Sequence, residues 1–142
     1  MKMYALDTNV VIDIIRGKPP YKARFDEMLI SQSKGDCGYL IPSVVFYEVM
    51  SGFYHTPSKS KQNLFENMCA RQSAPYVFSF SKNAVWDKAA QIYATLKQNG
   101  KMIGTGDILI AAYCLVNRLT LVTSNTKDFE VVEGLLFEDW TG

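Results

Sequence analysis

Short apolar runs alternate with longer segments of helical periodicity, and no other feature of this sequence restricts its fold so strongly. Five runs have the length and composition of buried strands, and they lie at residues 2–6, 37–41, 76–80, 119–123 and 135–137. Between them, apolar side chains recur at helical spacing at residues 10–16, 21–33, 43–54, 59–71, 82–98 and 108–117. Strands that alternate with helices predict an α/β sandwich with a mostly parallel sheet.

Capping and turn residues mark the ends of several of these elements. Ser81 and Asn83 are suited to cap the helix at 82–98, and Asn99 with Gly100 is suited to close it. Residues 124–128 are predicted to form a polar turn. The chain has no internal repeat and no linker composition, so we expect a single domain spanning residues 1–142.

Composition limits the classes of partner and compartment. The formal net charge is +1, so a site for a polyanion has to be local rather than spread over the surface. The three cysteines lack C-x-x-C spacing, which favours reduced thiols over disulfides or a zinc site. Asp7 and Asp13 interrupt the apolar N-terminal stretch, whereas a signal peptide has an uninterrupted apolar region there. No apolar run approaches the roughly 18 residues of a membrane span. We expect a cytoplasmic protein with no membrane partner.

Polar side chains follow two of the predicted strands at the point where each strand ends. Asp7 comes directly after the first strand, and Ser124, Asn125 and Asp128 follow the strand at 119–123. In open α/β sheets, ligands bind outside the carboxyl ends of the strands. We therefore expect these side chains to lie near a binding site.

Two further acids belong to predicted helices. Glu48 interrupts an apolar helix, where a carboxylate is costly without a partner such as a metal, and Asp107 stands at the entry of another. Each acid also has an ordinary explanation. Asp7 and Asp107 would serve as N-caps, Asp128 as a turn residue, and Glu48 as part of a solvated helix edge.

Taken together, the acids suggest a common chemistry. Clustered carboxylates suit Mg²⁺ or Mn²⁺ rather than zinc. One or two such ions activate water and neutralise charge on a phosphodiester under in-line attack. This chemistry needs no histidine, and the only one, His55, lies in a segment that breaks a helix.

The motifs that carry these acids resemble those of a known family. In order they are "LDTNVVID", "PSVVFYEVMSG", "GTGDILIAA", "LVTSNTKDF" and "FEDW". Over essentially the whole chain they are similar to the PIN-domain ribonucleases, specifically the VapC-type toxins of bacterial type II toxin–antitoxin pairs. The resemblance implies a PIN-like three-layer α/β/α sandwich and an endoribonuclease that cleaves RNA phosphodiesters by metal-activated water, with Mg²⁺ or Mn²⁺ as cofactor.

The resemblance also implies roles for individual residues. Asp7, Glu48 and Asp107 correspond to family acids that bind the metal and carry catalysis. The fourth position is divided between Asn125 and Asp128, of which only Asp128 offers a carboxylate as metal ligand and catalytic acid. The supporting polar residues implied by the resemblance are Thr8, Asn9, Ser124 and Asn125, with Asn9 orienting Asp7 by hydrogen bonding.

Substrate and partners follow from the same resemblance. Family toxins act on structured RNA, and the "EDW" tail favours tRNA, initiator tRNA in particular. They form homodimers and are silenced by a cognate VapB-like antitoxin, for which the helices at 44–54 and 59–71 offer surface. Their large apolar side chains, Tyr47, Phe53, Tyr54, Leu64 and Phe65, would serve equally as core. Candidate RNA-contacting cations are Lys18, Lys22 and Arg24, or Lys59, Lys61 and Arg71.

Two rival functions use the same residues differently. A catalytically silent PIN-like module would bind RNA or a protein without cleaving it, but such a module is expected to lose one or more acids, and Asp7, Glu48 and Asp107 all stand. A phosphatase of the D-x-D type is disfavoured because Asn9 occupies the position of its second acid.

Overall fold

The computed structural model describes residues 1–73 and 83–141. The strands in this part of the chain are β1 (Lys2–Leu6), β2 (Cys37–Leu40), β3 (Thr120–Val122) and β4 (Phe137–Glu138). The helices are α1 (Thr8–Ile15), α2 (Tyr21–Ser33), α3 (Ser43–His55), α4 (Lys59–Arg71), α5 (Ala84–Gln98), α6 (Thr105–Asn117) and α7 (Thr126–Phe129). Strands and helices alternate along the chain as the sequence predicts.

The four strands form one parallel sheet in the order β2-β1-β3-β4. The register pairs Tyr4 of β1 with Tyr39 of β2 on one side and with Thr120 of β3 on the other. The chain therefore extends the sheet in opposite directions from β1, which makes the gap between β1 and β3 a topological switch point. Ligand sites of open α/β sheets lie at the carboxyl ends of the strands at such a point.

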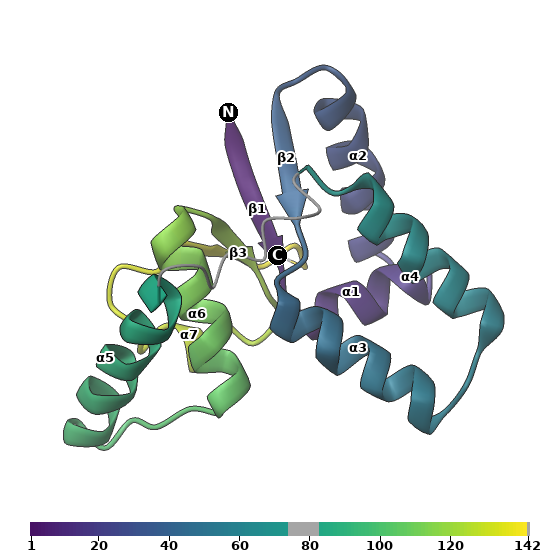
Figure 1. Ribbon diagram of the computed structural model, residues 1–142. Coiled ribbons are helices and arrows are strands. Elements are labelled where there is room, and N and C mark those ends of the chain that lie inside the picture. Colours follow the sequence, from purple (N-terminus) through teal and green to yellow (C-terminus); the bar gives the residue numbers. More distant parts are fainter. Residues whose placement is uncertain (74–82, 142) are drawn as a thin grey trace.

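Helices cover both faces of the sheet. Figure 1 shows α1, α2, α3 and α4 on one side of the strands and α5 and α6 on the other. The central strands lie in the core, where Leu6 of β1 and Leu121 of β3 are completely buried, as is Ala111 of α6. This arrangement confirms the predicted three-layer α/β/α sandwich, with a sheet whose four described strands are all parallel.

Several predicted boundaries agree with the structure and others need correction. The last strand lies at Phe137–Glu138 rather than 135–137, and part of the predicted turn at 124–128 belongs to the short helix α7. Asn83 precedes α5 in a left-handed conformation (φ 61°) and makes no side-chain capping hydrogen bond, so its predicted capping role is wrong. Ser81 and the predicted strand at 76–80 lie outside the described residues.

The end of α5 was anticipated correctly. Gly100 adopts a positive φ of 65°, and the backbone N–H of Lys101 returns to the Leu96 carbonyl at 2.9 Å, as in the glycine-terminated helix ends that this conformation permits. Within the described residues, no helix is both long enough and apolar enough to cross a membrane.

Candidate active site

Asp7 lies at the carboxyl end of β1, at the switch point of the sheet, and only 5% of it is exposed. Its backbone N–H donates to the Val122 carbonyl of β3 at 3.0 Å. Its Oδ1 accepts the Thr8 N–H at 2.9 Å, which makes Asp7 the N-cap of α1, and its Oδ2 accepts the Thr123 hydroxyl at 2.8 Å. Asp7 is therefore a helix cap and also a buried carboxylate whose orientation two donors fix.

The environment of Asp7 opposes its ionisation. Burial raises the pKa of the carboxyl, and the negative charge of Glu48 raises it further. The hydrogen bonds from Thr123 and Thr8 act in the opposite direction without cancelling the increase. A cation that approaches such a buried carboxyl stabilises its ionised form.

Glu48 reaches the same place from α3. It is half-buried rather than fully solvated, and its Oε1 accepts the Thr8 hydroxyl at 2.6 Å. The N-terminal turn of α6 packs against it, since a β-carbon at Gly106 would stand 3.3 Å from Glu48 Oε2. Thr8 thus connects the two acids, because its hydroxyl donates to Glu48 and its backbone N–H donates to Asp7.

Asp107 occupies the third position of α6. The N-cap of that helix is Gly104, so the alternative that Asp107 caps it is wrong. Burial raises the pKa of Asp107 to about 6, with further contributions, in decreasing order, from the negative charges of Asp7, Asp128 and Glu48. All three other candidate acids therefore act on Asp107 electrostatically.

The two candidates for the fourth position are neighbours joined by a hydrogen bond. Asn125 Nδ2 donates to Asp128 Oδ2 at 2.9 Å, and the backbone N–H of Asn125 donates to the Thr123 hydroxyl at 2.9 Å. The carboxylate at this position belongs to Asp128, at the third residue of α7. Asn125 holds that carboxylate in place.

The remaining supporting residues differ in how they meet the acids. Thr8 bonds two of them, as described above. Asn9 is exposed, and in the described part of the chain the hydrogen bonds to Asp7 come from Thr8 and Thr123, with none from Asn9. Ser124 is also exposed, and its hydroxyl interacts with the Tyr21 side chain.

No basic side chain neutralises the acids in the described residues. The two ion pairs found there are Lys2–Glu138 and Lys22–Asp26, and neither involves a candidate acid. The site therefore combines hydroxyl, amide and backbone donors with uncompensated carboxylates. Such a set attracts a cation and repels an anionic substrate in the cation's absence.

The acids do not form a ready-made metal cage. Across residues 1–73 and 83–141, no three His, Cys, Asp or Glu side chains stand close enough together to hold a metal ion by themselves. Mg²⁺ does not require such a cage, because it keeps several water ligands and binds proteins through one or two carboxylates. The all-oxygen donor set, its lack of a counter-cation and the raised pKa of Asp107 fit Mg²⁺ or Mn²⁺.

The first group of candidate RNA-contacting cations is partly engaged within the protein. Lys22 pairs with Asp26 of its own helix, and the Arg24 guanidinium lies over the Trp140 ring, 5.6 Å from its centre. Lys18, Lys59 and Lys61 are exposed. Of the first group, Lys18 is therefore the cation without such an intramolecular role in the described residues.

Two residues of the site were not anticipated from the sequence. Thr123 is completely buried and bonds both Asp7 and Asn125, and Gly106 leaves the space that Glu48 occupies. The only signal for Thr123 is a hydroxyl at the end of the apolar run "LTLVT". For Gly106 the signal is a glycine in the first turn of an otherwise apolar helix, where it costs helix stability.

Known proteins share this fold along nearly the whole chain. The PIN domain family model matches residues 4–135, so the chain belongs to the PIN-domain family. Among its relatives, the tRNA(fMet)-specific endonuclease VapC of Shigella flexneri is 31% identical over 143 residues, which span 99% of this chain and 100% of the relative. Ribonuclease VapC2 of Rickettsia felis is 28% identical over 138 residues, spanning 97% and 98%.

A solved structure extends the similarity to three dimensions. The crystal structure of VapBC2 from Rickettsia felis, bound to a DNA fragment from their promoter, contains a chain that matches this one with a TM-score of 0.82 and 26% identity. The match covers 97% of this chain and 98% of the other. Both comparisons agree with the VapC-type resemblance of the sequence motifs.

Proposed function

We propose that this protein is a metal-dependent endoribonuclease and the toxin of a toxin–antitoxin pair. One observation carries the proposal: the acid that follows β1 and the acids of α3, α6 and the segment after β3 interact at the switch point of the sheet, and in the described chain no cation neutralises them. The names of the relatives support it, since both are ribonucleases of the VapC type.

The candidate ligands are Asp7, Glu48, Asp107 and Asp128, of which one or two would bind the divalent cation directly and the others through its water ligands. When bound, Mg²⁺ or Mn²⁺ supplies Lewis-acid activation of water and neutralises charge on the scissile phosphate. The chain's own contribution is orientation. Thr8 bonds both Asp7 and Glu48, and Asn125 bonds Asp128. The carboxyl of Asp107, with its pKa of about 6, is mostly ionised in neutral solution and is therefore available to a cation there.

We propose tRNA as the substrate, and initiator tRNA as the preferred one. The proposal is supported by the relative from Shigella flexneri, whose name specifies tRNA(fMet), and by a second relative of the same name from Salmonella typhimurium that is 28% identical over 142 residues. Because tRNA is found in the cytoplasm, we propose that the protein acts there.

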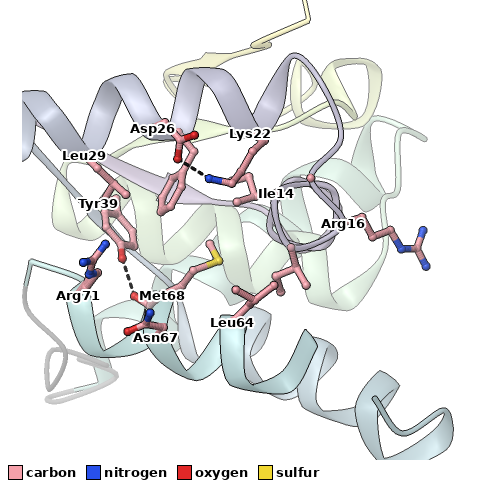
Figure 2. Close-up of a pocket in the computed structure, with 13 residues that line it drawn as sticks. Ile14, Arg16, Lys22, Asp26, Leu29, Tyr39, Leu64, Asn67, Met68 and Arg71 are labelled. Atoms are coloured by element: carbon pink, nitrogen blue, oxygen red, sulfur yellow. Dashed lines mark hydrogen bonds and ion pairs between the residues drawn. The ribbon is translucent and has the colours of Figure 1, made fainter. Parts of the chain in front are cut away.

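The partner that silences the toxin is proposed to be a VapB-like antitoxin. Its docking site would be a hollow of about 370 Å³ between α1, α2 and α4. Figure 2 shows Ile14, Leu29, Leu64 and Met68 around this hollow. The cations among its lining residues are Arg16, Lys22 and Arg71, of which Lys22 is paired with Asp26 in the same lining, so Arg16 and Arg71 supply its positive charge. An apolar segment with acidic side chains is the complement of such a surface.

The aromatic residues left undecided by the sequence now separate into two groups. Phe65 is completely buried and packs with Phe53 in the core. Tyr47 and Tyr54 are 70% and 80% exposed on α3. Large exposed aromatic side chains on one helix are typical of protein interfaces. We assign them to the proposed homodimer contact.

A second candidate function has one observation in its favour. The described residues contain no group of three acids at metal-binding spacing, as expected for a catalytically silent PIN-like module that binds RNA or protein. Such a module would leave its RNA intact, so the two functions are separated by cleavage.

The experiment is induction of the protein in a bacterial host, followed by growth measurement and sequencing of RNA 5′ ends. The wild type is expected to arrest growth and to create new 5′ ends within one or a few tRNAs. Asp7→Asn should do neither, whereas the control Asp13→Asn should behave as wild type. Equal arrest by wild type and Asp7→Asn, or arrest without new 5′ ends, would contradict the nuclease proposal.

A further inference from the structure

A second hollow, of about 500 Å³, lies between α1, α3 and the start of α4. Much of its lining is apolar: Ile15 and Val49 are buried, and Phe53 is half-buried. The Phe53 ring packs on Phe65, with 6.1 Å between the ring centres. Gly52 contributes no side chain to the lining, and a β-carbon there would have no neighbouring atom within 4 Å. The second hollow therefore offers open space beside an aromatic ring.

The charged side chains of the second hollow are all basic. Arg16, His55 and Lys61 line it, all three are exposed, and no acidic side chain of the described residues contributes to the lining. None of the three takes part in the two ion pairs found in residues 1–73 and 83–141. The second hollow thus carries uncompensated positive charge, the reverse of the acid cluster.

Helix stability explains two of these basic residues but not the third. Arg16 is the C-cap of α1 and His55 lies in the last turn of α3, where the helix dipole favours a positive charge. Lys61 is the third residue of α4, at the end where the dipole disfavours a cation. Its charge therefore calls for another explanation, and an anionic ligand supplies one.

The second hollow begins one helical turn from the acids. On α1, its lining residue Ile12 follows Thr8 by four positions, and on α3, Gly52 follows Glu48 by four positions. Four residues of helix span about 6 Å, and the Thr8 hydroxyl bonds Glu48 at 2.6 Å. RNA with its scissile phosphate at the acids would therefore extend a neighbouring nucleotide over this hollow.

We infer that the second hollow binds a nucleotide next to the scissile phosphate, with its base against Phe53 and its phosphate at Lys61 and Arg16. This inference rests on the proposed function. Proteins bind single-stranded nucleic acid by combining basic side chains with aromatic rings on which bases stack, and the loops of structured RNA present unpaired bases. Because the acids repel phosphates and the net charge is only +1, the affinity for RNA has to come from a local site of this kind.

An acidic side chain of the antitoxin is the alternative occupant. The second hollow shares Ile15 and Arg16 with the proposed antitoxin site between α1, α2 and α4. Figure 2 shows Arg16 at the edge of that site, with its guanidinium turned away from the other labelled side chains. The aromatic ring and the short distance to the acids favour a nucleotide.

The test uses purified initiator tRNA, with kcat and KM measured in Mg²⁺ and Kd measured by fluorescence anisotropy in EDTA at several salt concentrations. Lys61→Gln should raise KM and Kd by up to about fivefold and reduce the salt slope of log Kd by about 0.7–0.9, with kcat unchanged. Gly52→Leu fills the hollow without changing its charge and should raise KM by about fivefold or more. The control is Lys34→Gln, which removes an exposed charge at the end of α2, before β2, and should leave all three constants unchanged.

The remaining outcomes separate this inference from the proposed function. If the wild type cleaves tRNA and both Lys61→Gln and Gly52→Leu keep its KM, the second hollow takes no RNA and an acidic protein segment is its better occupant. An equal effect of Lys34→Gln and Lys61→Gln would show general charge attraction and also overturn the inference. A wild type that binds tRNA without cleaving it would contradict the proposed function, while the Kd values of the variants would still decide on the nucleotide site. Thermal unfolding in EDTA checks that each variant is folded.

Discussion

Replacing Asp107 with asparagine should stabilise the metal-free protein while removing its activity. The pKa of Asp107 rises from its ordinary 3.8 to about 6 because of burial and the charges of Asp7, Asp128 and Glu48. Since the pKa is higher in the folded than in the unfolded protein, ionisation of this carboxyl opposes folding. The contribution of this carboxyl to the free energy of unfolding is therefore fully present below about pH 4 and is lost as the pH rises through about 6.

The size of the effect follows from the same values. An increase in pKa from 3.8 to about 6 corresponds to about 3 kcal/mol for a fully buried carboxyl. Asp107 is only half-buried, so solvent screens part of this energy. Its place in the first turn of α6 also favours the charged form by about 0.3–1 kcal/mol. We expect a net gain of about 1 kcal/mol for Asp107→Asn, which corresponds to an increase in Tm of about 2–4 °C.

The assay is thermal unfolding in EDTA at pH 8 and at pH 5. The advantage of Asp107→Asn should be present at pH 8 and should fall to about half at pH 5, where wild-type Asp107 is mostly protonated in the folded state. The control is Asp87→Asn, which changes an exposed first-turn acid of α5 and should show no such gain. A variant no more stable than wild type at pH 8, or an advantage independent of pH, would refute the reasoning.

Three further predictions follow from individual contacts. Adding Mn²⁺ should raise the Tm of wild type, by the equivalent of about 2.7 kcal/mol at a hundredfold excess over Kd, and EDTA should reverse the increase, whereas Asp7→Asn should show little response. Leu64→Lys, at the proposed antitoxin site, should weaken antitoxin binding by about tenfold or more without impairing RNA cleavage. The control is Leu136→Lys, at an exposed leucine outside that site, which should change neither antitoxin binding nor RNA cleavage. At Gly52 in α3 an added β-carbon has no neighbouring atom within 4 Å, so Gly52→Ala should stabilise the protein by about 0.5–1 kcal/mol in denaturant unfolding. At Gly106 the added carbon would stand 3.3 Å from Glu48 Oε2, so Gly106→Ala should displace Glu48 and reduce RNA cleavage.

The sequence predicts those elements whose boundaries are local. The bounds of α2 and α4 agree with the predicted 21–33 and 59–71, because prolines precede both helices and their apolar side chains recur at helical spacing. The position of β4 could not be read in this way. It is two residues long and exists through its pairing with β3, a contact that periodicity does not encode.

The candidate site was predictable to a similar extent. The positions of Asp7 and Asp128 after two strands, together with the rule for parallel sheets, were sufficient to expect both acids near one site, and the charges of both raise the pKa of Asp107. The hydrogen bonds that orient them depend on tertiary packing. Thr123 becomes part of the site because β1 and β3 are adjacent, and its single hydroxyl gives no signal of that in the sequence.

The central claim is that these acids form a metal-dependent nuclease centre, and the most direct test is cleavage of purified initiator tRNA by the purified protein. With Mg²⁺ or Mn²⁺ present, we predict that the wild type cuts the tRNA at a defined position, that EDTA abolishes cleavage, and that Asp7→Asn and Asp107→Asn are inactive under all conditions. Cleavage that continues in EDTA, or that survives either substitution at the wild-type rate, would contradict the claim.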